Sequence, residues 1–167
     1  MTELVRKELI EDYTKGEVIV KNQKKTLKLA IIGGSVNSAV GYTHLIASQM
    51  DHRWQLVSAC FSRQQAINEA TVEAWNLHHI RLYQDWQSLL AKEKNEIDAI
   101  AILTPTPQHR DMVIQALLLG YAVICEKALA SSYQEALDIC ETLDKTKGFV
   151  AVTQNYTGYP MLRELRT

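Results

Sequence analysis

The chain has 167 residues, of which 47% are apolar and 22% are charged, and its formal net charge at pH 7 is -1. This length suffices for one domain with a hydrophobic core, and the apolar share excludes an intrinsically disordered chain. A nucleic-acid partner is not expected, because a protein that neutralises phosphates needs a basic face. A membrane partner is not expected either, because no apolar run approaches the roughly 20 residues that cross a bilayer. The first residues lack an apolar signal core, so the expected location is the cytoplasm.

Residues 1–26 differ from the rest of the chain and are predicted to form an N-terminal arm. The apolar residues of this arm have the spacing of a short amphipathic helix: Leu4, Val5, Leu9, Ile10 and Tyr13. A short strand at 17–21 and a basic, polar linker at 21–28 follow. Two interpretations stay open, a loosely packed arm and an arm that packs against a partner subunit.

From residue 27 onwards, short apolar runs alternate with stretches of helical periodicity. The predicted strands are 27–32, 55–61, 80–82, 99–103, 122–125 and 149–153. The predicted helices are 39–49, 64–75, 86–94, 108–119 and 133–147. The apolar runs are continuous rather than alternating, which is typical of strands covered on both faces. We therefore predict an α/β fold, a doubly wound and mostly parallel sheet that binds its ligand at the carboxyl ends of the strands.

Turn and capping residues support these boundaries. Ser131 or Ser132, with Glu135 downstream, resembles a capping box at the start of the last helix. Gly120 and Gly148 stand where glycines commonly end helices.

A glycine-containing loop at 33–41 joins the first strand to the first helix. Its candidate phosphate-binding residues are Gly33, Gly34, Ser35, Asn37, Ser38 and Ala39. Gly33 suits the tight turn and Gly41 a close approach of helix and strand, while Asn37 stands where a glycine is usual and tolerates positive φ. Backbone N–H groups and the helix N-terminus would face a pyrophosphate. A glycine-bearing turn without a ligand is the alternative, because one imperfect motif is weak evidence.

The end of the second strand carries the next candidate pair, Ser62 and Arg63. A ribose with free hydroxyls is usually held by an Asp or Glu at this point, and this chain has neither. A hydroxyl and a planar cation suit a 2′-phosphate better. We therefore predict NADP as the cofactor, with NAD as the alternative. The other interpretation is that Arg63 is a solvated residue at the start of a helix.

Cysteine and histidine usage predicts no disulfide framework and no metal site. The chain has three cysteines, Cys60, Cys125 and Cys140, and no two of them form a C-x-x-C pair. We expect all three to be buried or half-buried small hydrophobes. The adjacent His78 and His79 have no carboxylate at ligand spacing.

Two further segments complete a resemblance to a known family. Residues 104–109 read Thr-Pro-Thr-Pro-Gln-His, and residues 125–129 read Cys-Glu-Lys-Ala-Leu. Together with the glycine loop and the following Gly-Tyr-Thr-His at 41–44, they look like the N-terminal half of the Gfo/Idh/MocA oxidoreductases, which include glucose-fructose oxidoreductase and inositol dehydrogenase. The resemblance covers about residues 27–166 and implies a Rossmann-like nucleotide-binding domain over 27–155.

The resemblance also implies roles for individual residues. Thr104, Pro105 and His109 would line the cofactor cleft near the ribose and nicotinamide. Glu126 and Lys127 match the Glu-Lys-Pro motif of the family, in which the lysine faces the nicotinamide and positions or polarises the substrate hydroxyl, so Lys127 is the candidate catalytic residue. A lysine suits this role because its surroundings readily shift its pKa.

Asn155 would lie at the mouth of the same cleft. This chain departs from the pattern of the family at Ser35 and Asn37, where glycine is common, and at Ala128, where proline is usual. The loss of the proline removes a constraint on the turn that carries Lys127.

Members of this family continue into a second domain that supplies catalytic groups, holds the substrate and forms the oligomer interface. Residues 156–167 resemble the start of the crossover to that domain. We therefore expect the nucleotide-binding domain of an oxidoreductase acting on a sugar, polyol or related carbonyl compound, inactive as this chain alone because half a cleft positions little substrate. The alternative is a dinucleotide-binding or assembly module without turnover. A homodimer is expected because apolar faces are otherwise bare.

Overall fold

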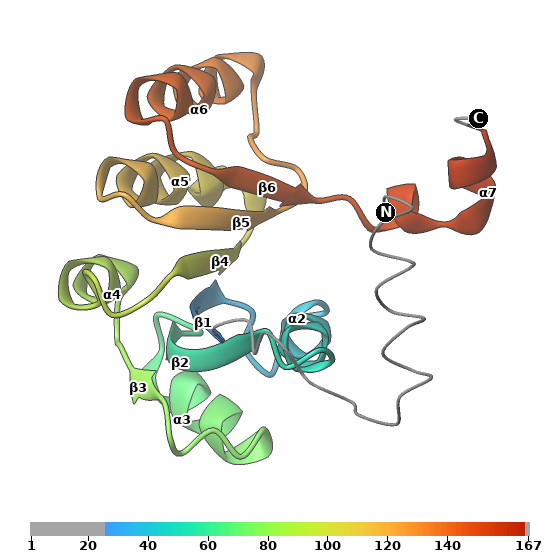
Figure 1. The fold of residues 1–167 in the computed structure, drawn as a ribbon. Helices are drawn as coiled ribbons and strands as arrows, with labels where there is room; N and C mark the ends of the chain where they lie inside the picture. The colour runs from blue at the N-terminus through green and yellow to red at the C-terminus, as the bar shows by residue number, and fades with distance from the viewer. Residues whose placement is uncertain (1–25, 166–167) are drawn as a thin grey trace, which may run out of the picture.

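The computed structural model describes residues 26–165 (Figure 1). The predicted N-terminal helix and strand therefore lie outside the described residues. Six strands form one sheet: β1 (Leu27–Gly33), β2 (Trp54–Cys60), β3 (Arg81–Leu82), β4 (Ala99–Leu103), β5 (Ala122–Glu126) and β6 (Val150–Thr153). The strand order is β3-β2-β1-β4-β5-β6, and each neighbouring pair is parallel. The predicted doubly wound α/β fold is confirmed, and this sheet is wholly parallel.

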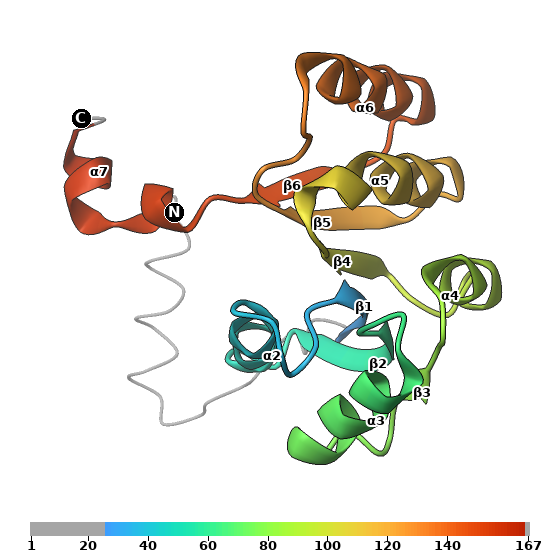
Figure 2. The ribbon, with the colours of Figure 1, turned by 180° about the vertical axis from the view of Figure 1, so that it is seen from behind.

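Helices cover both faces of the sheet (Figures 1 and 2). The helices α2 (Gly41–Gln49) and α3 (Gln65–Ala74) pack on one face. The helices α4 (Trp86–Lys92), α5 (His109–Leu118) and α6 (Tyr133–Thr146) pack on the other. Two 3-10 turns, η1 (Thr106–Gln108) and η2 (Asn155–Gly158), and the short α7 (Pro160–Glu164) complete the described chain. None of the helices within 26–165 is long and apolar enough to cross a membrane.

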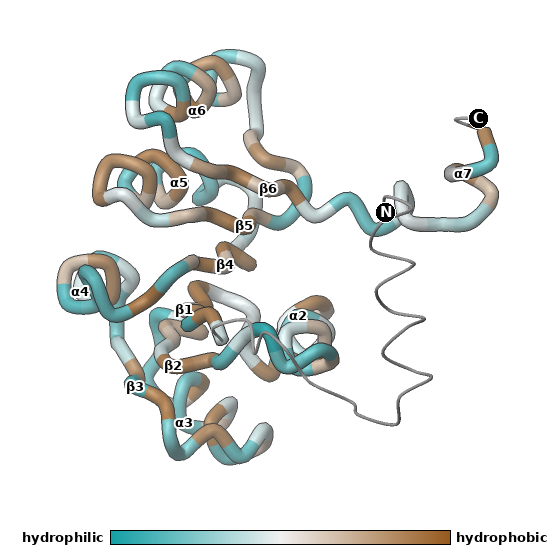
Figure 3. The backbone as a smooth tube through the Cα atoms, viewed as in Figure 1, coloured by the Kyte–Doolittle hydropathy of each residue, from teal (hydrophilic) through white to brown (hydrophobic). Residues whose placement is uncertain are grey.

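The apolar core lies along the middle strands (Figure 3). All five residues of β4 are buried, and the two faces of the sheet carry separate apolar clusters. Leu45 of α2 packs in the first cluster, while Val113 of α5 and Ile139 of α6 pack in the second. Burying one such side chain contributes roughly 1.5–3 kcal/mol to stability. Strands flanked by helices bury side chains on both faces, as β4 does here, which explains the unbroken apolar runs in the sequence.

The helix α6 begins at the predicted residue and ends one residue before the predicted 147. The Ser132 hydroxyl accepts a hydrogen bond from the Glu135 N–H at 3.2 Å, and the Glu135 carboxylate accepts one from the Ser131 N–H at 2.7 Å. The predicted residues therefore cap the helix, although the Glu135 carboxylate reaches the N–H of Ser131 rather than that of the N-cap Ser132, so the capping box is present in a modified form. At the other end the left-handed residue is Lys147, with φ 52°, rather than Gly148. Gly148 instead permits close packing, since a Cβ there would lie 2.7 Å from a methyl group of Leu117.

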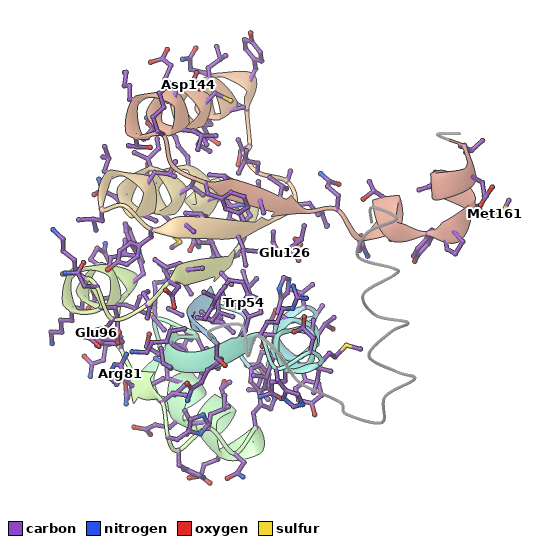
Figure 4. All side chains as sticks on the ribbon, in the orientation of Figure 1. Trp54, Arg81, Glu96, Glu126, Asp144 and Met161 are labelled. Carbon is purple, nitrogen blue, oxygen red and sulfur yellow. The ribbon has the colours of Figure 1, made fainter. Side chains whose placement is uncertain are left out.

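A buried carboxylate holds the β3 edge of the sheet. Glu93 is fully buried, and its two oxygens accept hydrogen bonds from the Arg81 guanidinium at 2.7 and 2.6 Å. The Tyr83 hydroxyl donates a third at 2.8 Å. Burial raises the pKa of Glu93, but the hydrogen bonds from Arg81 and Tyr83 and the charge of Arg81 outweigh burial and lower this pKa below its usual value. Figure 4 shows Arg81 on β3.

We expect Arg81→Met to lower the free energy of unfolding by about 3 kcal/mol at pH 7, because Glu93 then stays buried without its cation. In the wild type, ionised Glu93 contributes to stability at pH values above the usual pKa of a glutamate. This contribution is lost as the pH falls through the lowered pKa of Glu93 in the folded protein. In the variant the hydrogen bond from Tyr83 still opposes the effect of burial, but Arg81 no longer does. Glu93 therefore takes up a proton more easily, and the stability penalty shrinks on acidification. Urea unfolding between pH 7 and pH 4 measures this.

Arg53→Met is the matched control, since Arg53 pairs with Asp51 at 3.0 Å on an exposed surface. We expect a change below about 0.5 kcal/mol for this control. Equal effects of the two substitutions would contradict the role of the buried pair.

Candidate functional site

A hollow of about 630 Å³ opens at the carboxyl ends of β1, β2 and β4. The glycine loop lines one side with Gly33, Gly34, Ser35, Asn37 and Ser38. The end of β2 contributes Ser62 and Arg63, and the segment after β4 contributes Thr104 and Pro105. Three loops that are far apart in the sequence thus surround one space, as a parallel sheet requires of the loops at its carboxyl edge.

The glycine loop has the backbone geometry of a close strand–helix contact. Gly33 and Gly34 adopt left-handed φ values of 81° and 70°, which L-residues with a Cβ rarely reach. A Cβ on Gly41 would collide with the carbonyl of Gly34, so the predicted close approach of α2 to the loop is present. Asn37 does not adopt positive φ, and the expectation that it replaces a left-handed glycine is wrong. The two leading glycines already complete the turn.

Ser38 has a capping role that the sequence analysis did not anticipate. Its hydroxyl oxygen accepts hydrogen bonds from the N–H groups of Val40 and Gly41 at 3.2 and 3.3 Å. The hydroxyl proton remains available to a ligand, because both of these contacts use the oxygen as acceptor. The positive end of the α2 dipole lies at the same loop. Ala39 is exposed and does not line the hollow.

The β2 side of the hollow combines an apolar floor with a polar rim. Phe61 is buried and meets Trp75 edge to face, with ring centroids 5.6 Å apart. The Ser62 hydroxyl accepts a hydrogen bond from the Gln64 N–H at 3.1 Å, and Arg63 is exposed. Of the described residues around the hollow, Asp111 on the α5 side is the one carboxylate. The β2 side therefore offers a hydroxyl and a cation but no acid.

His109 lies beneath the hollow rather than on its wall, which corrects its expected place. Its side chain is fully buried. The ring Nδ1 lies 2.8 Å from the carbonyl oxygen of Ala128, and the ring Nε2 lies 2.7 Å from that of Thr104. His109 thus joins the loop after β4 to the loop after β5.

The residues of the loop after β5 lie outside the hollow. Glu126 ends β5 (Figure 4), and its Oε1 lies 2.7 Å from the Nε2 of His44 on α2. Its second oxygen accepts a hydrogen bond from the Lys127 N–H at 3.1 Å. Lys127 and Asn155 are both exposed, and the Lys127–Ala128 peptide is cis.

The ionisation of Glu126 depends on its contacts. Partial burial raises the pKa of Glu126, but hydrogen bonds from His44 and Thr153, together with the charge interaction with His44, outweigh burial and lower this pKa below its usual value of 4.5. A carboxylate therefore stands beside the Lys127 backbone at neutral pH.

Several residues around the hollow were missed by sequence reasoning. Trp86, Asp111 and Met112 line the hollow from α4 and α5. The start of α4 was readable, since the Asp85 carboxylate accepts a hydrogen bond from the Ser88 N–H at 2.7 Å as an N-cap. That Trp86 faces the hollow depends on how α4 packs against α5, which no local pattern encodes.

Two of the three cysteines, Cys60 and Cys125, are buried and show no reactive environment. Burial raises the pKa of Cys60 to about 11 and that of Cys125 to about 12, so both thiols are protonated at neutral pH. Cys140 is exposed, contrary to the expectation that all three are at least half-buried. Residues 26–165 contain no group of three or more His, Cys, Asp or Glu side chains that could hold a metal ion.

Comparisons with known proteins agree with this geometry. A model described as an oxidoreductase family with an NAD-binding Rossmann fold matches residues 27–154. The uncharacterized oxidoreductase YfiI of Bacillus subtilis is 30% identical over 155 residues, which make up 90% of this chain and 39% of that protein. The D-apiose dehydrogenase of Paraburkholderia graminis is 27% identical over 139 residues, 83% of this chain and 35% of that protein.

Among solved structures, an inositol dehydrogenase homolog from Azotobacter vinelandii, complexed with NADH and myo-inositol, matches with a TM-score of 0.75 and 26% identity. The match covers 84% of this chain and 38% of that one. The chain thus spans well under half the length of each of these three proteins.

We expect Glu126→Gln to lower the free energy of unfolding by about 1 kcal/mol at pH 7, because the amide replaces a charged acceptor of the His44 contact. The contribution of ionised Glu126 is present above its usual pKa and is lost as the pH falls through the lowered folded value. The difference between variant and wild type should therefore shrink below about pH 4.5, as measured by chemical unfolding at several pH values.

Glu141→Gln serves as the control, because Glu141 forms only an exposed contact with Lys145 at 3.5 Å. An effect of at most about 0.5 kcal/mol is expected there. A pH-independent effect of Glu126→Gln would contradict the assigned ionisation.

Proposed function

This chain belongs to the Gfo/Idh/MocA oxidoreductase family, which has an NAD-binding Rossmann fold, and we propose that its hollow binds NADP, with NAD as the alternative. The reaction proposed for the protein is hydride transfer between this cofactor and a sugar, a polyol or a related carbonyl compound. The observation that carries the proposal is the joint lining of one hollow by the glycine loop and by Ser62 and Arg63.

The glycine loop supports the phosphate end of this proposal. Gly33 and Gly34 leave no side chain between the loop backbone and a ligand, and the close contact of Gly41 brings the α2 N-terminus to the same place. Backbone N–H groups and the helix dipole favour a pyrophosphate there. The Ser38 hydroxyl oxygen accepts a hydrogen bond from the Gly41 N–H, which leaves its proton free to be donated to such a group.

The preference for NADP over NAD follows from the β2 side of the hollow. A carboxylate at this point would accept hydrogen bonds from ribose hydroxyls and repel a 2′-phosphate. Arg63 offers a guanidinium that can bind a phosphate through two parallel hydrogen bonds, and the Ser62 hydroxyl is its neighbour. The resemblance of this chain to a homolog complexed with NADH keeps NAD as the alternative.

Lys127 is the proposed catalytic residue. When bound, the oxidised cofactor would supply a hydride acceptor. The carbon that carries the substrate hydroxyl would lose a hydride, the hydroxyl proton would pass to water, and a carbonyl would form. Lys127 would position or polarise that hydroxyl, with Glu126 and His44 supporting its loop and Asn155 at the mouth of the cleft. A relative named for D-apiose and a homolog complexed with myo-inositol support a sugar or polyol as substrate.

An alternative function is a dinucleotide-binding or assembly module without turnover. Lys127 is exposed and lies outside the hollow, and substrate positioning accounts for much of enzymatic rate enhancement. The homodimer and the cytoplasmic location stay predictions. The exposed apolar residues of η2 and α7, among them Tyr156 and Met161, are consistent with a further contact surface.

Titration with NADPH and NADH, followed by tryptophan fluorescence, tests the cofactor proposal. We expect NADPH to bind more tightly than NADH. The substitution Arg63→Met should raise the Kd for NADPH about tenfold and change the Kd for NADH less than about twofold, because only NADPH would make the charge-assisted contact.

The control for the loss of an exposed arginine is Arg53→Met. The substitution Gly41→Ala should abolish the binding of both cofactors. Equal affinities in the wild type would contradict the NADP preference.

Turnover by this chain alone is expected to be absent. A panel of sugars and polyols with NADP or NAD should yield no increase in absorbance of reduced cofactor above the rate without protein, because an exposed Lys127 positions little of a substrate. Turnover that Lys127→Met abolishes would overturn the expected inactivity and support the role of the lysine. Turnover that survives this substitution would contradict both.

A further inference from the structure

Asn68 holds the end of β2 from behind the hollow. Its side chain is fully buried on α3. The amide oxygen accepts a hydrogen bond from the Ser62 N–H at 2.8 Å, and the amide nitrogen donates one to the Ser62 carbonyl at 2.9 Å. Ser62 lies beyond the last residue of β2, so no neighbouring strand pairs with it. Asn68 takes the place of that strand and fixes the backbone that carries Ser62 and Arg63.

Thr71, one turn further along α3, holds the glycine loop. Its side chain is also fully buried. The hydroxyl accepts a hydrogen bond from the Val36 N–H at 3.0 Å and donates one to the Ile67 carbonyl at 2.7 Å. Val36 lies in the middle of the loop that joins β1 to α2. The hydroxyl therefore ties the centre of the glycine loop to the helix that also holds Ser62.

On the basis of the proposed function, we propose that Asn68 and Thr71 are positioning residues that set the cofactor affinity and selectivity of the hollow. Thr71 positions the glycine loop, which would meet the pyrophosphate common to both cofactors. Asn68 positions Ser62 and Arg63, which would meet the group at the ribose 2′ position. Neither side chain lines the hollow, so each acts through the loop that it holds.

The chemistry of the two side chains supports this assignment. A buried polar group without a partner is costly. Here Asn68 forms both of its hydrogen bonds with the backbone of Ser62, after β2. Thr71 accepts one from the glycine loop and donates one within its own helix. Because Asn68 and Thr71 are three residues apart, they lie on the same face of α3. One rigid helix thus fixes the two loops relative to each other.

Isosteric substitutions separate the two roles. Thr71→Val removes the hydroxyl at nearly constant volume, and we expect the Kd values for NADPH and NADH to rise together, each about tenfold, with their ratio unchanged within about twofold. Thr71→Ser retains the hydroxyl and should restore wild-type affinity. Asn68→Asp keeps the acceptor for the Ser62 N–H but loses the donor to its carbonyl, and should change the NADPH-to-NADH ratio at least about threefold.

If the two side chains only stabilised the fold, both substitutions would lower the melting temperature without separate effects on affinity and on the NADPH-to-NADH ratio. The affinities are therefore measured well below the melting temperature. Unchanged affinity for both cofactors in Thr71→Val, or an equal change for both in Asn68→Asp, would overturn the proposal. Failure of the wild type to bind either cofactor would instead refute the proposed function and the inference with it.

Hydrogen exchange of the wild type gives a test that requires no variant. The Val36 and Ser62 amide hydrogens should exchange slowly although both residues lie in loops, because each N–H is bonded to a buried side chain. The Val36 amide should lose this protection in Thr71→Val and keep it in Thr71→Ser. Fast exchange of both amides in the wild type would contradict the tethering by α3.

Discussion

The contact between Gly34 and Gly41 is the constraint on which the site depends. A side chain on Gly41 would collide with the Gly34 carbonyl, so α2 can reach this position only with glycine there. The same close approach directs the α2 N-terminus toward the hollow. It also brings His44, one turn further along α2, within 2.7 Å of Glu126 on β5. A single backbone contact thus places both the proposed phosphate-binding loop and the support of the proposed catalytic lysine.

The carboxyl edge of the sheet is held by buried polar side chains, whereas the centre of the sheet is held by apolar ones. His109 joins the loops after β4 and β5, and Asn68 and Thr71 join the loops after β1 and β2 to α3. Loop backbone groups beyond the strand ends lack ladder partners, and leaving such groups buried and unpaired is costly. These side chains satisfy those groups and at the same time restrict the loops to one arrangement around the hollow.

Much of the fold could be predicted, and less of the site. The residues after β1, β2 and β4 were expected to surround a ligand site, and Gly33, Ser62 and Thr104 do line one hollow. Asn37 was given a backbone role that Gly34 fills, and His109 was expected on a wall that it only supports. Each of these errors concerns the direction of a side chain or a local φ value. Motif matching assigns a position in the chain but not that direction.

The alternation of strands and helices, the parallel sheet and the position of the glycine loop could all be predicted from the sequence, because continuous apolar runs, helical periodicity and turn residues are local properties. Which side chains meet could not be predicted in this way. His44 and Glu126 are 82 residues apart in the chain, and Arg81 finds Glu93 only where β3 passes α4. Such contacts depend on how the apolar faces of whole helices and strands pack against one another. No pattern within a single segment encodes that packing.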